Sequence, residues 1–212
     1  MEPFIRSDQY NFIRAQTQIL INGHAAANDI HVIHTLKNLA QEKVQKLFVE
    51  LTDGQRQLIN PILTVKDKTS AEAYLAELKA YVIPFKLITE QTLKKLFPKA
   101  KKLKLPLLEE IDLRELSYLG WNDKGSNKKF IIAPLDNRLK GLQGTFTPSN
   151  KKGICALCNG YEELGLFMSE TKGSGQDNFI KRGNYICRDS LTCNHNLTEL
   201  DKLHDFIGRL TS

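Results

Sequence analysis

The stretches Cys155-Ala-Leu-Cys158 and Cys187-Arg-Asp-Ser-Leu-Thr-Cys193 contain all four cysteines of the chain, and 28 residues separate the two pairs. A Cys-x2-Cys turn brings two thiolates close enough to share one ion, and a second pair completes a tetrahedron. Zn²⁺ favours such a closed four-sulfur shell, with bonds of about 2.3 Å. A closed shell leaves no open position for a substrate or an activated water. The spacing therefore predicts one structural zinc ion bound by Cys155, Cys158, Cys187 and Cys193.

Two disulfides are the alternative use of four cysteines. The sequence has no N-terminal segment with a basic start, an apolar run and a small-residue cleavage site. It also has no uninterrupted apolar stretch near 18 residues, so no membrane-spanning helix is expected. These features predict a cytoplasmic protein, in which thiols stay reduced and metal binding is favoured over disulfides.

The excess positive charge lies in the second part of the chain. Residues 1–83 contain nine Lys/Arg and nine Asp/Glu, so residues 84–212 hold the remaining 21 basic and 15 acidic residues. The density of lysine is highest in residues 94–104, which contain Lys94, Lys95, Lys99, Lys101, Lys102 and Lys104. This Lys-rich segment is either a surface for phosphate or an acidic partner, or the solvated face of a segment that packs on the core. Composition leaves both interpretations open.

Hydrophobic spacing predicts helices throughout residues 1–83. The expected helices are 8–22, 29–51, 55–64 and 69–81. Asn22-Gly23 is a plausible stop for the first, and Pro61 argues against a regular helix in the second half of the third. Thr69 with Glu72 predicts a capping box for the fourth. Helices joined by short loops pack as an antiparallel bundle, so residues 1–83 are predicted to form one domain that ends before Pro84.

The second domain, residues 84–212, is predicted to mix short helices with strands. Thr89 can cap a helix over residues 90–97, which Pro98 ends. From Leu113 onward the hydrophobic period changes to two, which predicts an antiparallel meander with Trp121 as a core anchor. Its expected strands are 117–121, 130–133 and 139–146, with a turn at residues 136–137 before the last.

The zinc module is expected to follow the meander. Two further strands are predicted over residues 163–169 and 178–186, and then one helix that Asp189 or Ser190 caps and that runs to about Leu210. Cys193 falls in the first turn of that helix, where the helix dipole favours the thiolate. His195 could replace one sulfur as a ligand, but with four thiols present an ordinary surface histidine is expected.

A knuckle, a hairpin and a helix that supplies the last ligand make a treble-clef arrangement. The predicted fold class is therefore α+β. It combines an N-terminal antiparallel helical bundle with an α/β domain that contains an antiparallel meander and a four-cysteine treble-clef-like zinc module. A treble clef by itself does not indicate a function, because many unrelated proteins use it.

Four segments carry a resemblance to a known family. They are Tyr118-Leu-Gly-Trp-Asn-Asp123, Ser126-Asn-Lys-Lys-Phe-Ile-Ile132, Lys152-Gly-Ile-Cys-Ala-Leu-Cys158 and Tyr185-Ile-Cys-Arg-Asp-Ser190, the last followed by Cys193-Asn194. They resemble the FusB-type elongation factor G-binding proteins, which are associated with fusidic acid resistance in Gram-positive bacteria. The resemblance is specific in the C-terminal half, and in the N-terminal half it rests on length and helical layout.

The resemblance implies a non-enzymatic, zinc-containing cytoplasmic protein that binds the C-terminal domains of elongation factor G. Such proteins drive the factor off the ribosome and so relieve stalling by fusidic acid, with no small-molecule substrate and no membrane. The family's contact positions correspond to Ile154, Arg182, Tyr185 and Phe206, where Ile154 replaces an aromatic residue and Arg182 a lysine. The spacing of Phe206 from Leu203 equally suits packing in the core.

The alternative function is an RNA- or ribosome-binding zinc protein that uses the Lys-rich segment, residues 94–104. It predicts RNA binding that depends steeply on salt. An enzyme is not expected, because the sequence lacks a phosphate-binding Gly-rich loop ending in Lys-Ser/Thr, a nucleophile elbow and an open metal site.

Overall fold

The structure is a computed structural model that describes the chain apart from residues 101–102, 104, 107–110, 124, 173–178 and 212. Its internal contacts divide the chain into two compact units, Met1–Ile83 and Pro84–Ser212. The first unit has one hydrophobic core, and the second has two. Among the described residues no helix combines the length and apolarity needed to cross a membrane.

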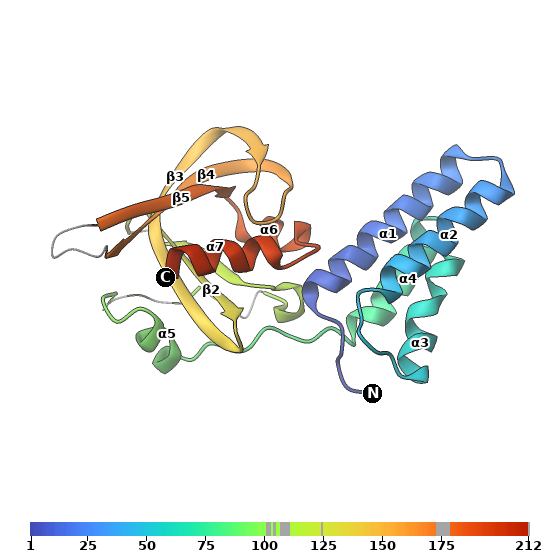
Figure 1. Ribbon diagram of the computed structural model, residues 1–212, viewed down its shortest axis with the longest axis horizontal. Helices are drawn as coiled ribbons and strands as arrows, with labels where there is room; N and C mark the ends of the chain where they lie inside the picture. The colour runs from blue at the N-terminus through green and yellow to red at the C-terminus, as the bar shows by residue number, and fades with distance from the viewer. Residues whose placement is uncertain (101–102, 104, 107–110, 124, 173–178, 212) are drawn as a thin grey trace. The chain divides into compact units, whose positions relative to one another are not determined.

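The first unit is helical (Figure 1). Its elements are α1 (Ser7–Ala26), α2 (Ile30–Gln45), α3 (Asp53–Ile59), the 3-10 helix η1 (Asn60–Thr64) and α4 (Lys68–Lys79). The core contains mainly aliphatic side chains from all of these elements, among them Ile13, Leu20, Val44, Ile59, Ile62 and Leu78. The change to a 3-10 helix occurs at Pro61, as the sequence suggested. The expectation of a helical N-terminal domain is confirmed.

Two features of the long helices differ from the sequence prediction. Helix α1 continues through Asn22-Gly23 to Ala26, and a Cβ added at Gly23 would come within 2.5 Å of the Leu36 side chain of α2. Gly23 therefore permits close approach of two helices rather than ending one. Helix α2 ends six residues before the predicted Leu51, and its N-terminal Ile30 is exposed, because α2 packs mainly on α1 and η1.

The cap of α4 also lies earlier than predicted. Asp67, not Thr69, is the N-cap, and its Oδ1 accepts a hydrogen bond of 2.8 Å from the Ser70 backbone N–H. The Ser70 hydroxyl in turn accepts a hydrogen bond of 3.1 Å from the Asp67 N–H, which completes a capping box. The observed box therefore uses Asp67 and Ser70 in place of the predicted Thr69 and Glu72.

The second unit is built on one five-stranded antiparallel sheet with the order β1-β2-β3-β4-β5 (Figure 1). The strands are β1 (Leu119–Asp123), β2 (Lys128–Leu135), β3 (Arg138–Ile154), β4 (Tyr161–Lys172) and β5 (Phe179–Cys187). The helices are α5 (Glu90–Leu96), the 3-10 helix η3 (Leu113–Glu115), α6 (Ser190–Asn196) and α7 (Asp201–Thr211). The predicted α+β class is confirmed.

Strand β3 joins the predicted meander and the predicted hairpin of the zinc module into one sheet. It is 17 residues long and pairs with β2 through its first half and with β4 through its second half. The register shifts between Pro148 and Lys152, where proline has no N–H to donate. The turn between β2 and β3 is as predicted, because Asp136 and Asn137 have φ values of 51° and 59°, typical of a type I′ hairpin.

The helix predicted after Asp189 is divided into two. Asp189 caps α6, but the chain leaves the helix after Asn196, and Leu197 has extended angles and a buried side chain. Helix α7 begins only at Asp201. The run Asn194-His195-Asn196 has low helix propensity, so burial of Leu197 outweighs continuation of the helix.

Strand β2 has a core on each of its faces. Phe130 and Ile132 pack with Phe97 of the α5 segment, whereas Ile131 and Ala133 pack with α7 and the four cysteines. Successive side chains of a strand point to opposite faces, so a strand buried on both sides lacks the alternation of polar residues. Trp121 stacks on Phe130 with ring centroids 5.4 Å apart, which confirms it as a core anchor.

We predict that Gly165→Ala destabilises the second unit. An added Cβ would overlap the ring of Phe146, a buried and rigid side chain, and such overpacking costs about 1–3 kcal/mol of unfolding free energy. Urea unfolding followed by Trp121 fluorescence measures this unit, because Trp121 is the only tryptophan. Gly208→Ala in α7 is the control: no atom lies within 4 Å of its added Cβ, so stability should be unchanged or higher. Equal unfolding free energies of the two variants would contradict the close packing of Gly165 against Phe146.

Candidate zinc centre and interaction surface

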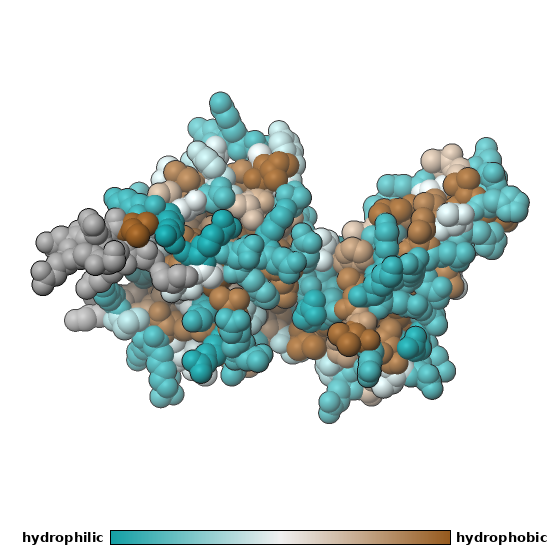
Figure 2. All heavy atoms as spheres, in the orientation of Figure 1, coloured by the Kyte–Doolittle hydropathy of each residue, from teal (hydrophilic) through white to brown (hydrophobic). Residues whose placement is uncertain are grey.

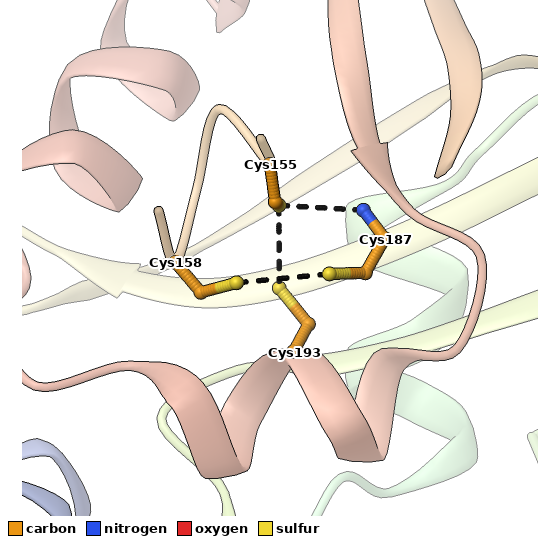
Figure 3. A group of neighbouring side chains, drawn as sticks. All are labelled: Cys155, Cys158, Cys187 and Cys193. Atoms are coloured by element: carbon orange, nitrogen blue, oxygen red, sulfur yellow. Dashed lines mark hydrogen bonds between the residues drawn. The ribbon is translucent and has the colours of Figure 1, made fainter. Parts of the chain in front are cut away.

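The four cysteines converge from three parts of the second unit (Figure 3). Cys155 and Cys158 lie in the turn between β3 and β4, Cys187 is the last residue of β5, and Cys193 lies in α6. All four side chains are buried, and their sulfur atoms lie within 4.8 Å of one another. The structure therefore brings together every cysteine that the spacing selected.

The geometry of the sulfur atoms fits a tetrahedral zinc ion. Sulfurs bonded at about 2.3 Å to one centre lie about 3.8 Å apart at the tetrahedral angle. The Sγ atoms are 3.8 Å apart for Cys155 and Cys193 and 3.6 Å apart for Cys158 and Cys187. The cysteines form no disulfide, so the alternative of two disulfides is wrong.

Backbone N–H groups point at the sulfurs, as expected for thiolates that need donors. Cys155 Sγ accepts hydrogen bonds of 3.3 Å from the N–H groups of Leu157 and Cys187, and Cys158 Sγ accepts one of 3.4 Å from Gly160. The sharp bend after the knuckle falls on Asn159, which has a φ of 61°. Asparagine tolerates this left-handed conformation better than most residues.

The four thiols also need a cation if all are to ionise. Hydrogen bonds from Cys158 and the other two cysteines lower the pKa of Cys155. The hydrogen bond to Cys155 raises the pKa of Cys187 and the pKa of Cys193. Without a cation, ionisation of the Cys155 thiol is thus favoured, and ionisation of the Cys187 and Cys193 thiols beside it is disfavoured. A divalent cation replaces the shared protons, and with four protein ligands its role is structural.

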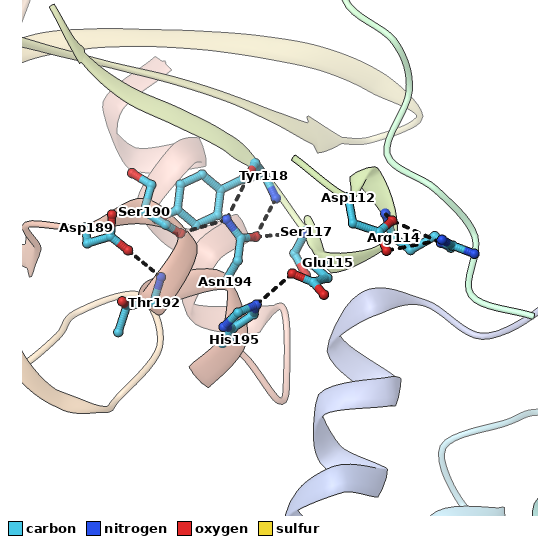
Figure 4. Close-up of polar contacts among 10 residues, drawn as sticks. All are labelled: Asp112, Arg114, Glu115, Ser117, Tyr118, Asp189, Ser190, Thr192, Asn194 and His195. Carbon is cyan, nitrogen blue, oxygen red and sulfur yellow. Dashed lines mark hydrogen bonds and ion pairs between the residues drawn. The ribbon is translucent and has the colours of Figure 1, made fainter. Parts of the chain in front are cut away.

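A buried asparagine next to the last ligand binds α6 to the segment just before β1 (Figure 4). The Asn194 side-chain oxygen accepts hydrogen bonds from the N–H groups of Ser117 at 2.7 Å and Tyr118 at 3.1 Å. Its amide nitrogen donates to the carbonyls of Tyr118 and Ser190, both at 2.9 Å. Sequence reasoning missed this role, because nothing in the sequence distinguishes a buried asparagine from an exposed one. Its only signal was its place directly after Cys193.

His195 faces away from the metal ligands. Its Nε2 lies 3.0 Å from Glu115 Oε2 of η3, and both side chains are partly exposed (Figure 4). The expectation that His195 is not a ligand agrees with this contact. Asp189 is the N-cap of α6, with its carboxylate accepting from the Thr192 N–H at 2.7 Å.

Two of the four proposed contact residues are exposed next to the zinc centre. Ile154, at the end of β3, is 59% exposed, and Tyr185 of β5 is 49% exposed. The Tyr185 carbonyl accepts a hydrogen bond of 2.9 Å from Ala156 in the zinc knuckle, so both residues are held by the same turn. Ile154 pairs across the strands with Tyr161, which is 65% exposed and which sequence reasoning missed. Only the register of β3 and β4 reveals this neighbour.

The other two proposed contact residues have structural partners. Phe206 is 4% exposed and its ring packs 5.8 Å from that of Phe167, so it belongs to the core and does not present a contact surface. Arg182 is exposed, but its Nη1 donates a 3.1 Å hydrogen bond to the carbonyl of Arg209 in the last turn of α7. It lies three residues from Tyr185 on one strand, and therefore on the opposite face of the sheet.

Three of the six lysines of the Lys-rich segment, residues 94–104, lie among the described residues. Lys94, Lys95 and Lys99 are exposed, while the neighbouring Leu93 and Phe97 pack in the core. This alternation agrees with the interpretation as a solvated face of a docked segment. Lys101, Lys102 and Lys104 lie outside the described residues.

We predict that removal of the metal unfolds the second unit alone. Chelation, or Cys158→Ser, leaves buried thiolates uncompensated, and binding energy of a structural zinc is folding energy. Trp121 fluorescence should shift to that of an exposed indole, whereas the far-ultraviolet helical signal of residues 1–83 should persist. Adding Zn²⁺ back to chelated wild-type protein serves as the control. A Cys158→Ser variant with a buried Trp121 would show that the metal is not required for folding.

We also predict that Asn194→Ala lowers the free energy of unfolding of the second unit by at least about 2 kcal/mol. The substitution leaves the Ser117 and Tyr118 N–H groups without their partner in a buried site. The measurement is urea unfolding of the zinc-loaded protein. Asn150→Ala, at an exposed position of β3, should change stability by less than about 0.5 kcal/mol. A loss at residue 194 no greater than at residue 150 would rule out the proposed network.

Comparison with known proteins assigns the family. Residues 4–86 match the family described as elongation factor G-binding protein, N-terminal, and residues 95–207 match the FBP C-terminal treble-clef zinc-finger. No curated protein matches the chain. A solved structure, that of the fusidic acid resistance protein FusC, is 33% identical, covers 98% of each chain and superposes with a TM-score of 0.85. The four sulfurs are thus the treble-clef site for one Zn²⁺, and the chain belongs to the elongation factor G-binding protein family.

Proposed function

We propose that this protein binds elongation factor G through its second unit and promotes release of the factor from the ribosome, which relieves stalling by fusidic acid. Both halves of the chain match the family in order, and the FusC structure shares the whole arrangement at 33% identity. The family consists of binding proteins, so the proposed function involves no catalysis. Because elongation factor G works on ribosomes, we place the protein in the cytoplasm.

The observation that carries the proposal is a set of exposed apolar side chains around the zinc knuckle, in which Tyr185 lies on the sheet face opposite to Ile154 and Tyr161. We call it the knuckle patch and define it as Ile154, Tyr161 and Tyr185. Figure 2 shows that apolar residues interrupt the otherwise polar surface of the second unit. Tyrosine is a frequent hot-spot residue, because it brings a large rigid surface and a polar end. The zinc knuckle holds the patch rigid, so little entropy is lost on binding.

The release step needs no chemical reaction. A protein that binds the free factor more tightly than the ribosome-bound factor shifts the equilibrium toward release by the difference between the two affinities. The patch is small, so we expect further contacts around it. Arg182, on the other face of the edge strand β5, is exposed enough to take part if the partner wraps around that edge.

We predict that Tyr185→Ala weakens binding of purified elongation factor G by about 10- to 100-fold, as expected for a hot-spot tyrosine. Tyr161→Ala should weaken it in the same direction. Val49→Ala, a fully exposed apolar position of the first unit, is the control and should leave the dissociation constant unchanged. Calorimetry gives the affinities, and zinc content confirms that each variant keeps its metal. An unchanged affinity for both tyrosine variants would place the interface elsewhere.

Release is tested separately with ribosomes stalled by fusidic acid. Wild-type protein should free elongation factor G, and Tyr185→Ala should need a correspondingly higher concentration. Binding without release would retain the partner and overturn the mechanism. Binding that nuclease abolishes, with a steep salt dependence, would instead favour the RNA-binding alternative.

A further inference from the structure

Lys129 is a buried lysine on the zinc-facing side of the sheet. It shares a face of β2 with Ile131 and Ala133, both of which pack in the core that contains the four cysteines. Its exposed fraction is 0%, unlike the neighbouring Lys128, which is exposed. A buried ammonium group is costly unless hydrogen bonds and an opposite charge compensate it.

The direct contacts of Lys129 are all neutral. Its Nζ donates a 2.9 Å hydrogen bond to the Arg188 carbonyl, lies 3.4 Å from Asn122 Oδ1 and sits 4.7 Å from the centroid of the Phe146 ring. Within the described part of the chain no carboxylate lies within 4.0 Å of this ammonium group. The opposite charge must therefore come from a greater distance.

The four cysteines, in the core that also contains Ile131 and Ala133 from the same face of β2, are one source of negative charge, and the Asp189 carboxylate is another. Burial lowers the pKa of Lys129 to about 8, and the negative charges of Cys193, Asp189, Cys187 and Cys155 oppose this effect. The lysine therefore remains largely protonated at neutral pH. Four thiolates and one Zn²⁺ carry a net charge of −2 in a buried site, which itself needs a cation nearby.

We propose that Lys129 is the counter-cation of the zinc centre: its buried ammonium group offsets part of the net negative charge of the four-thiolate site and thereby raises the affinity for Zn²⁺. The hydrogen bond to the carbonyl of Arg188 also joins Lys129 to the turn between Cys187 and Cys193, at the residue that follows the ligand Cys187. Lys129 acts through the ligands and is a positioning residue that does not bind the metal.

The test separates the charge from the hydrogen bond. Lys129→Met removes both, whereas Lys129→Gln removes the charge but keeps a donor for the Arg188 carbonyl. We expect each to weaken zinc binding by about 10- to 100-fold, the range found when residues that support the metal ligands are replaced. The affinity is measured on the full-length protein by competition with a chromophoric chelator. Ile131→Val, a small core change on the same face, should weaken it less than about threefold. Near wild-type affinity of Lys129→Gln would overturn the role of the charge.

The test remains decisive if a variant folds poorly. Reconstitution with Co²⁺ gives a visible spectrum that reports whether the tetrahedral four-sulfur shell forms. A Lys129→Met or Lys129→Gln variant that folds only in excess Zn²⁺ supports the proposal, because mass action then replaces the lost affinity. Variants that stay unfolded and colourless in saturating metal would show that Lys129 serves packing alone.

Discussion

The convergence of four thiolates on one point is the constraint on which the second unit depends. Cys155 and Cys158 lie in the turn between β3 and β4, Cys187 ends β5 and Cys193 lies in α6, so one ion links the turn, the sheet edge and the helix that follows. Apolar burial alone would tolerate small shifts among these elements, because it has no direction. Metal–sulfur bonds do not, since their lengths and angles are narrowly defined.

Features encoded by neighbouring residues could be predicted from the sequence. The zinc ligands, the turn at Asp136-Asn137 and a helix cap at Asp189 or Ser190 each depend on a few adjacent positions. Features that depend on distant partners could not be predicted. Gly23 resembles a helix stop until Leu36 is seen beside it, and the unity of the sheet depends on the length of β3.

The candidate interface shows the same division. Resemblance pointed to Phe206, but whether an aromatic residue on a helix faces solvent or core depends on the packing of α7 against the sheet. Tyr161 was missed because its neighbour Ile154 lies on another strand, and only the register of β3 and β4 joins them. Lys129 was hidden for a similar reason: in sequence it is one of several lysines, and only its face of β2 distinguishes it.

A structural metal and a partner-binding function are physically connected. A surface made of a few exposed side chains binds well only if those side chains are held in place before the partner arrives. The zinc knuckle does this for Ile154 and Tyr185, because Ala156, within the knuckle, donates a hydrogen bond to the Tyr185 carbonyl. In the proposal above, the buried ammonium group of Lys129 offsets part of the negative charge that the metal site places in the core. Loss of either the metal or its counter-charge should therefore weaken recognition by loosening the patch, even though neither touches the partner.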